Sequence, residues 1–408
     1  MDNMKSDKFW KYLKALLIVY AFYSLHCWPF FNVNDMNMKL AFIGLLLPCL
    51  NRPYWNTSAK RIHIIIVLEI LLLYVAGLGN FNRYLFAIVG SVPLISLILL
   101  KEEYLKDLFE TFQKVLAPIL GLGALFWIAH LFGYDLPYQN ISFGVRETSQ
   151  GDLVDQYTFQ NHYLYLVNIS WMMDINANIP SYFRFSSIFL EPGYTAVLVM
   201  YLLYLNHFEF KYRRNQVYLL TLLLTLSLAG FILTLFAFIA HKLQNSSKRV
   251  TTLVGIGLLL TFGYIFFTNY NGGHNAINET IIERLQYDEE NRFVGNNRTS
   301  EAMDAQFDAF LVSPDIIFGL RDKNLLEFGV GYKAYLLMNG IIGMILFIVY
   351  LLQIAKLKGN FRSYVLMTLY LLMFARGHSS MFWAAVTLIY MAGVMKSDEV
   401  KISKDLHT

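Results

Sequence analysis

The chain has 408 residues, of which 56% are hydrophobic, 16% aromatic and only 15% charged. Soluble domains carry about 25% charged residues, so this composition excludes an ordinary soluble enzyme. The formal net charge of +4 is spread over many loops, which argues against a nucleic-acid-binding surface. Apolar segments long enough to cross about 30 Å of hydrocarbon recur along nearly the whole length. The sequence therefore predicts one polytopic membrane domain over residues 1–408.

These segments predict an all-α fold with about 10 to 12 transmembrane helices. They lie near 10–31, 35–50, 62–79, 82–100, 113–134, 189–207, 217–240, 250–269, 334–355, 362–376 and 380–395. Lysines precede the first segment and no small-residue cleavage site follows it, which indicates an uncleaved first span. Two polar stretches, 135–188 and 270–333, are long loops and thus candidates for function or for local helices.

The distribution of lysine and arginine predicts the orientation of the spans. With the N-terminus in the cytoplasm, a single crossing at 217–240 would leave three basic residues outside: Lys242, Lys248 and Arg249. Small residues that allow a turn back lie at the middle of this segment: Ser227, Ala229 and Gly230. We therefore expect two short helices that meet at 227–230 with both outer ends cytoplasmic, although an ordinary span with a tolerated glycine is the alternative. The re-entrant geometry places both long loops on the same, extracytoplasmic side of the membrane and the C-terminus in the cytoplasm.

The stretch RFSSIFLEPG places Arg184 and Glu191 at the entrance of the sixth span. Because Pro192 suits the first turn of a helix, we expect Glu191 at the N-cap. There a carboxylate and a guanidinium could form a base and an anion clamp. The alternative is a capping glutamate and an arginine that snorkels to the interface.

The second long loop predicts two helices, one over 276–287 on the membrane surface and one after NRFVGNNRTSE. The second helix has an apolar stripe and a Ser-Pro stop: Met303, Phe307, Phe310, Leu311, Ser313 and Pro314. Arg292 and Arg298 flank the turn that enters it, where backbone amides and an arginine together suit a phosphate or diphosphate. Arg298 is the better candidate because it stands at the helix entry. An ordinary solvated loop is the alternative.

Near the C-terminus, LYLLMFARGHSSMFW places Arg376 and His378 at the outer end of a span. His378 could exchange a proton near neutral pH or donate to a phosphate oxygen. A structural interfacial histidine is the alternative. The acidic run 288–290 lacks a histidine or cysteine at ligand spacing and no cofactor motif is present, so we expect neither a metal nor a cofactor.

Several of these patterns resemble the O-antigen polymerase (Wzy) family. They are Arg184 before F-x-E-P-G, the small-residue LSLAG at 226–230, the long outer loop, and EFGVGYKAYLLMNGIIGMILFIVYLL at 327–352. The likeness covers about residues 180–395. The resemblance implies a C-type glycosyltransferase of the bacterial inner membrane. Such an enzyme polymerises undecaprenyl-diphosphate-linked repeat units into O-antigen or capsular polysaccharide at the periplasmic face.

The resemblance also implies roles for individual residues. Arg184 and Arg298 match family arginines that engage the lipid diphosphates, while Arg292 and Arg376 are further substrate-binding candidates. Glu191 is the candidate base for the acceptor hydroxyl, or the group that orients Arg184. His378 lies later in the chain than the histidine of the related ligases. Membrane lipids, a chain-length regulator and a flippase are candidate partners, and no nucleic acid is expected.

Two alternatives share much of this evidence. An O-antigen ligase has the same architecture and differs in its acceptor. A flippase or other transporter would place charges inside the helical bundle, where Glu69 is the main example. The sequence shows no pair of corresponding broken helices, which weakens a transporter built on inverted repeats.

Overall fold

The structure is a computed structural model. It describes the chain except for residues 1, 26, 31–34, 77–80, 135–136, 144–145, 148–152, 155–156, 163–165, 172–183, 190, 246–248, 276, 279–281, 287–300, 321–330, 376–383 and 396–408. The chain divides into two compact units, one formed by residues 1–115 and 302–408 and the other by residues 116–301. The single transmembrane domain predicted over residues 1–408 stays a prediction.

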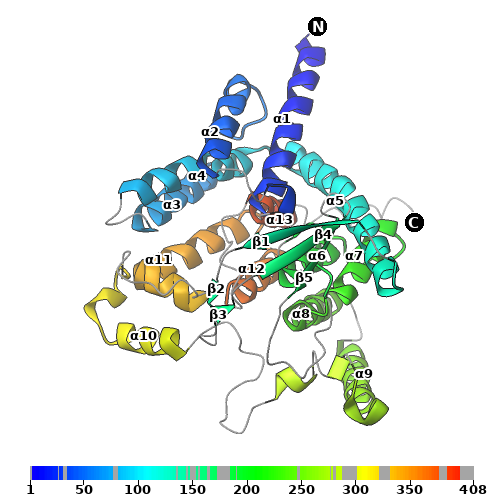
Figure 1. Cartoon of the computed structure of the whole chain (residues 1–408). Coiled ribbons are helices and arrows are strands. Elements are labelled where there is room, and N and C mark those ends of the chain that lie inside the picture. Colours follow the sequence, from blue (N-terminus) through cyan, green and yellow to red (C-terminus); the bar gives the residue numbers. More distant parts are fainter. Residues whose placement is uncertain are drawn as a thin grey trace. The chain divides into compact units, whose positions relative to one another are not determined.

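Each predicted apolar segment contains a helix (Figure 1). The first unit holds α1 (Asp2–Ser24), α2 (Asp35–Leu46), α3 (Lys60–Ala76), α4 (Phe81–Leu99), α10 (Glu301–Leu311), α11 (Tyr332–Ala355), α12 (Phe361–Ala375) and α13 (Ala384–Met395). The second unit holds α6 (Pro192–Leu205), α7 (Arg213–Leu224), α8 (Leu228–Asn245) and α9 (Arg249–Asn269). Helix α5 (Glu102–Leu131) begins in the first unit and ends in the second. Single 3₁₀ turns are η1 (Trp28–Phe30), η2 (Leu47–Cys49), η3 (Tyr270–Gly273), η5 (Glu283–Leu285) and η6 (Pro314–Ile316).

The helices carry apolar side chains outward, as membrane helices do. Among the described residues, α5 and α11 are each long and apolar enough to cross a membrane, and several other apolar helices are shorter. Large apolar side chains are exposed along α3: Ile64, Val67, Ile70, Leu71 and Tyr74. Such a surface would be costly in water but is suited to lipid. A helical protein with candidate membrane spans is therefore observed, while the number of spans remains a prediction.

The first long loop corrects the all-α prediction, because part of it forms β-strands. β1 (Tyr138–Phe143), β4 (Tyr157–His162) and β5 (Val167–Trp171) make an antiparallel sheet with β4 in the centre. β2 (Arg146–Glu147) and β3 (Leu153–Val154) form a separate two-stranded ribbon. The strands are rich in aromatic and β-branched residues, which favour extended backbone.

The predicted break within 217–240 is confirmed, and it lies slightly earlier than expected. Helix α7 ends at Leu224 and α8 begins at Leu228, with Leu226 between them at a φ of 44°. Phe208, beyond the end of α6, packs against Phe238 near the end of α8 with ring centroids 5.3 Å apart. The outer ends of α7 and α8 therefore lie at the same end of α6, as the re-entrant hypothesis requires.

A second break was not predicted and lies inside α11. Gly340 has a φ of 64° and a ψ of −173°, so the helix is interrupted there. The chain just after η6 pairs with both halves: Leu320 N donates to Leu337 O at 2.7 Å and Ile342 N donates to Ile317 O at 3.1 Å. These bonds satisfy backbone groups that the interruption would otherwise leave unpaired. This break is additional to the one predicted near 217–240.

The second long loop matches its prediction in part. Helix α10 has the predicted apolar stripe, since Phe307 and Phe310 are buried against α11 residues Ala334 and Leu337. It ends before Ser313, whose hydroxyl donates to Phe310 O at 2.9 Å, and Pro314 starts η6. In the segment 276–287, where a surface helix was predicted, the described residues 277, 278 and 282 are helical and the 3₁₀ turn η5 follows them.

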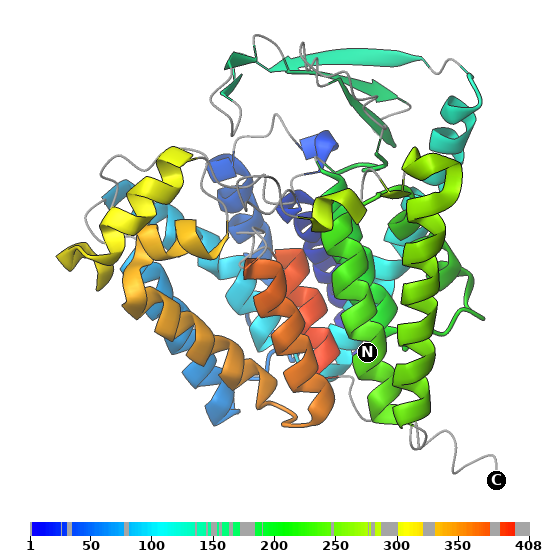
Figure 2. The same ribbon diagram turned by 90° about the horizontal axis from the view of Figure 1, so that it is seen from below.

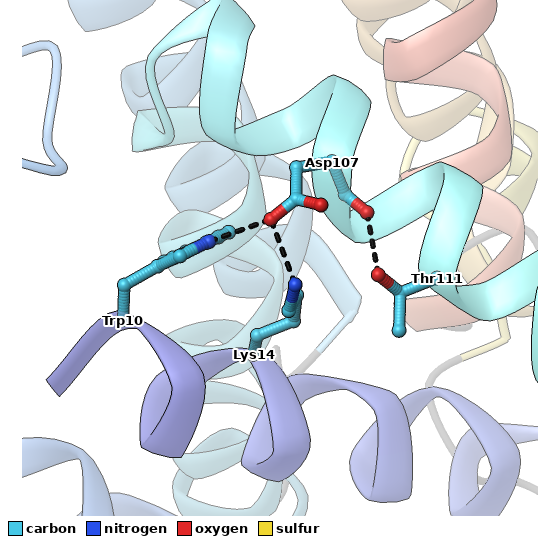
Figure 3. A network of polar contacts seen from close by, with 4 residues as sticks. All are labelled: Trp10, Lys14, Asp107 and Thr111. Carbon is cyan, nitrogen blue, oxygen red and sulfur yellow. Dashed lines mark hydrogen bonds and ion pairs between the residues drawn. The ribbon is translucent and has the colours of Figure 1, made fainter. Parts of the chain in front are cut away.

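In the first unit, a polar cluster ties α1 to the beginning of α5 (Figure 3). Asp107 Oδ2 accepts from Trp10 Nε1 at 2.6 Å and from Lys14 Nζ at 2.9 Å. Thr111 Oγ1 donates to the backbone carbonyl of Asp107 at 2.8 Å. Asp107 precedes the apolar segment 113–134, so the cluster lies at the end of the helices that the charge distribution assigns to the cytoplasm.

Candidate functional site

Arg184 is the first described residue of a buried segment that leads into α6. Phe185 and the four residues that follow it are almost fully buried. This is unusual, because connecting segments generally lie on the protein surface. Phe185 packs in a cluster with Ala124 and Trp127 of α5, with the Phe185 and Trp127 rings 6.1 Å apart. Ser186 O accepts from the hydroxyl of Thr195 in α6 at 2.8 Å. The segment is therefore fixed to α5 on one side and to α6 on the other.

Arg184 is held at the break between α7 and α8. Its Nε donates to Thr225 O at 3.0 Å, and the next amide, Phe185 N, donates to Leu224 O at 3.1 Å. Both acceptors are carbonyls at the C-terminal end of α7, where the helix dipole favours a cation. This position within the fold differs from that of an arginine that only snorkels to the membrane interface.

Glu191 lies at the N-cap of α6, as predicted. Its φ of −133° and ψ of 142° are extended, and Pro192 opens the helix. Its backbone carbonyl accepts from Tyr194 N at 3.2 Å. Within the described chain, however, its side chain makes no capping hydrogen bond to the first turn. The position is a cap, but the carboxylate is not used as one, which weakens the purely structural alternative.

The N-terminus of α8 lies beside the N-terminus of α6. A Cβ on Gly230 would lie 2.4 Å from Ala196 Cβ, so only glycine permits this approach. Ser227 caps α8, because its Oγ accepts from Gly230 N at 3.3 Å. Since α6 and α8 run in the same direction, the positive ends of two helix dipoles meet next to Arg184. Each contributes about half an elementary charge.

The sheet of the first long loop reaches the same place. A Cβ on Gly123 of α5 would lie 2.7 Å from Leu166 O, in the turn before β5, and 2.9 Å from Ser187 Oγ. Leu166, α5 and the segment after Arg184 therefore converge on one glycine. The first long loop, α5 and the segment after Arg184 therefore meet near the N-termini of α6 and α8. Chemically, a guanidinium beside two helix N-termini can bind an anion.

The other candidate residues lie outside the described residues: Arg292, Arg298, Arg376 and His378. Arg298 belongs to the stretch directly before α10, which begins at Glu301. Arg376 and His378 follow the end of α12 at Ala375. Within the described part of the chain, no cluster of three or more histidine, cysteine, aspartate or glutamate side chains is placed to hold a metal ion.

Comparisons with known proteins give no name to this arrangement. No family model, curated protein or solved structure matches the chain. The proposals below therefore rest on the residues and on the geometry described above.

Sequence reasoning missed the partners of Arg184. Thr225 acts through its backbone carbonyl, which no side-chain pattern reveals. Thr195, which ties α6 to Ser186, looks like an ordinary polar residue in an apolar helix. The only sequence signal for the contact between Arg184 and Thr225 is the LSLAG break, because a helix that ends inside an apolar segment exposes carbonyls that need donors.

Proposed function

We propose that the second unit binds a lipid-linked diphosphate at Arg184 and that the chain is a polysaccharide polymerase. It would join undecaprenyl-diphosphate-linked repeat units into O-antigen or capsular polysaccharide at the periplasmic face of the bacterial inner membrane. The observation that carries the proposal is the bond from Arg184 Nε to Thr225 O, at 3.0 Å, beside the N-termini of α6 and α8. The bond orients the guanidinium, and the planar fork of an arginine matches the oxygens of a diphosphate.

The proposed chemistry needs little more than this site offers. A lipid diphosphate is a good leaving group, so the main requirement is positive charge that stabilises it as the glycosidic bond breaks. The acceptor sugar hydroxyl attacks the anomeric carbon, and its proton passes to a base. Glu191 is the proposed base, since its half-buried carboxylate is at the helix start and does not cap the helix. Arg298 is a further proposed diphosphate ligand and His378 a further proposed catalytic residue, and both lie outside the described residues.

The proposal is tested with the purified full-length protein in lipid vesicles, supplied with undecaprenyl-diphosphate-linked repeat units. Polymerisation gives a ladder of glycan lengths on a gel. Arg184→Ala should reduce ladder formation at least 100-fold, on the order of the loss of one transition-state donor. Arg213→Ala, at the exposed opposite end of α7, is the matched control and should retain activity. A normal ladder from Arg184→Ala would sink the site assignment.

The glycans of cells that lack the protein distinguish a polymerase from a ligase and from a flippase. Loss of a polymerase should leave a single repeat unit on the acceptor, loss of a ligase should leave none attached, and loss of a flippase should trap units inside. A transporter is the second candidate, because two observations favour it over a surface enzyme. The interruption of α11 at Gly340 gives the first unit a broken helix, and Glu69 is a fully buried acid.

A further inference from the structure

Glu69 occupies a place in α3 where an apolar residue is expected. The buried face of α3 repeats at helical spacing: Ile62, Ile65, Glu69, Leu72 and Val75. All the others are apolar. The exposed faces of α3 carry large apolar side chains, whereas its one carboxyl group, that of Glu69, is buried. A chance polar substitution would be tolerated more easily at the surface.

Neither carboxyl oxygen of Glu69 has a hydrogen-bond partner among the described residues, and the side chain is 0% exposed. An isolated carboxylate in such a place is strongly disfavoured, because nothing replaces its lost hydration, and binding a proton removes the charge. Even the neutral acid destabilises the fold when its polar atoms are unsatisfied. Packing alone gives no reason to keep this cost, since leucine would fit the stripe.

The surroundings of Glu69 are tyrosines rather than cations. Helix α3 runs antiparallel to α11, with Arg61 donating to Lys356 O at one end and Val75 beside Gly343 nearer the other. Figure 2 shows α11 in orange beside the blue helices of the same unit. At the level of Glu69, Tyr350 of α11 and Tyr370 of α12 are close enough to feel its charge. Tyr370 stacks on Tyr390 of α13, with ring centroids 5.0 Å apart.

Among the side chains that the structure describes, the remaining neighbours supply no compensating charge. The described side chains of α4, from residue 88 to residue 99, include none that titrates, although α4 packs against α3. His63 on α3 itself is exposed. Tyrosine hydroxyls can donate to a carboxylate or accept from a carboxylic acid, but they cannot neutralise it. A proton is therefore the ligand that this environment selects.

We propose that Glu69 is an exchangeable proton-binding site inside the first unit, protonated while α3 is packed against α11. Its charge state is linked to that packing, because the ionised side chain must find water or a new partner. This site is separate from the Arg184 site and does not depend on the activity proposed for it.

The test is infrared spectroscopy of the full-length protein in lipid vesicles. Subtracting the Glu69→Gln spectrum from the wild-type spectrum at pH 7 should leave the carbonyl band of a protonated carboxylic acid. That band should convert to carboxylate bands as the pH is raised. Glu69→Asp, which moves the band without removing it, serves if Glu69→Gln does not fold. Glu103→Gln, at the start of α5, is the control for an ordinary carboxylate.

Three outcomes would overturn the proposal. A carboxylate signal at pH 7 would show that Glu69 is ionised and has a cation partner. An acid band that no pH change converts would identify a permanently neutral core residue. Loss of the acid band on adding sodium at constant pH would assign the site to a metal cation instead. Chemical labelling gives a second measurement of the protonation state. An apolar carbodiimide reacts with protonated acids, so it should modify Glu69 less as the pH rises.

Discussion

The Nε atom of Arg184 donates to the carbonyl oxygen of Thr225 across 3.0 Å, which joins the entrance of α6 to the break between α7 and α8. The two residues come from features that look independent in sequence, a charged span entrance and a small-residue interruption. Their contact explains both. The interruption exposes carbonyls at the end of α7, and Arg184 is the cation that meets them.

The first prediction concerns the shape of the Arg184 side chain. Arg184→Lys keeps the positive charge but replaces a planar fork with a point charge. We expect it to lose the bond to Thr225 and to keep only part of the polymerising activity, with a raised KM for the lipid diphosphate. Steady-state kinetics in vesicles check this. Equal kinetics for lysine and arginine would show that charge alone matters and that the fork is not used.

The second prediction separates the two roles of Glu191. Glu191→Gln removes a base without changing the shape of the side chain, so kcat should fall about 100-fold or more. Thermal stability should fall little, because glutamine keeps the size of the side chain and can still form hydrogen bonds. If Glu191→Gln lowered stability and left kcat nearly unchanged, Glu191 would be a positioning residue for Arg184.

The sequence predicted the elements of this site better than their contacts. The Glu-Pro step correctly placed Glu191 at an N-cap, since proline restricts both itself and its predecessor. The break was expected at 227–230 and lies at 225–227, because Ser227 becomes the cap of α8. The strands of the first loop were missed, because each has six residues or fewer and such short segments leave only a weak local signal.

The third prediction tests the approach of α8 to α6. Gly230→Ala places a Cβ 2.4 Å from Ala196 Cβ, and overpacking of this kind costs about 1–3 kcal/mol. Thermal unfolding in detergent should show the loss, and a second change, Ala196→Gly, should restore part of it. Gly257→Ala in α9 is the matched control, because no described atom lies within 4 Å of its built Cβ. Equal melting of the two variants would contradict the contact.

The fourth prediction concerns the cluster in Figure 3. Partial burial disfavours the charged form of Asp107, but hydrogen bonds from Lys14 and Trp10 outweigh it and hold its pKa below the usual value. A depressed carboxyl pKa stabilises the fold above the unfolded value of about 3.9 and loses that effect as the pH falls below it. Because the side chain is 46% exposed, the effect should be no more than about 1 kcal/mol.

Asp107→Asn keeps the shape of the side chain but removes its charge. Its melting temperature should therefore lie slightly below wild type at pH 7 and approach wild type under acidic conditions. Glu103→Gln, on the same helix, should show no such convergence. A constant difference between Asp107→Asn and wild type at all pH values would mean that shape, and not charge, ties α1 to α5.

The last prediction concerns the interruption of α11, which the sequence concealed. An Asn-Gly pair, Asn339 and Gly340, is a turn signal, but the long apolar run around it favoured a continuous span. With a φ of 64° and a ψ of −173°, Gly340 is in a region that is essentially restricted to glycine. A Cβ there would also lie 2.4 Å from Ile317 O.

Gly340→Ala should therefore destabilise the fold by about 1–3 kcal/mol or more. Gly44→Ala in α2, where no described atom lies within 4 Å, should not. If Gly340→Ala melted like wild type, α11 would be a continuous helix. The chain after η6 would then need other partners for its backbone, and the broken-helix evidence for a transporter would be lost.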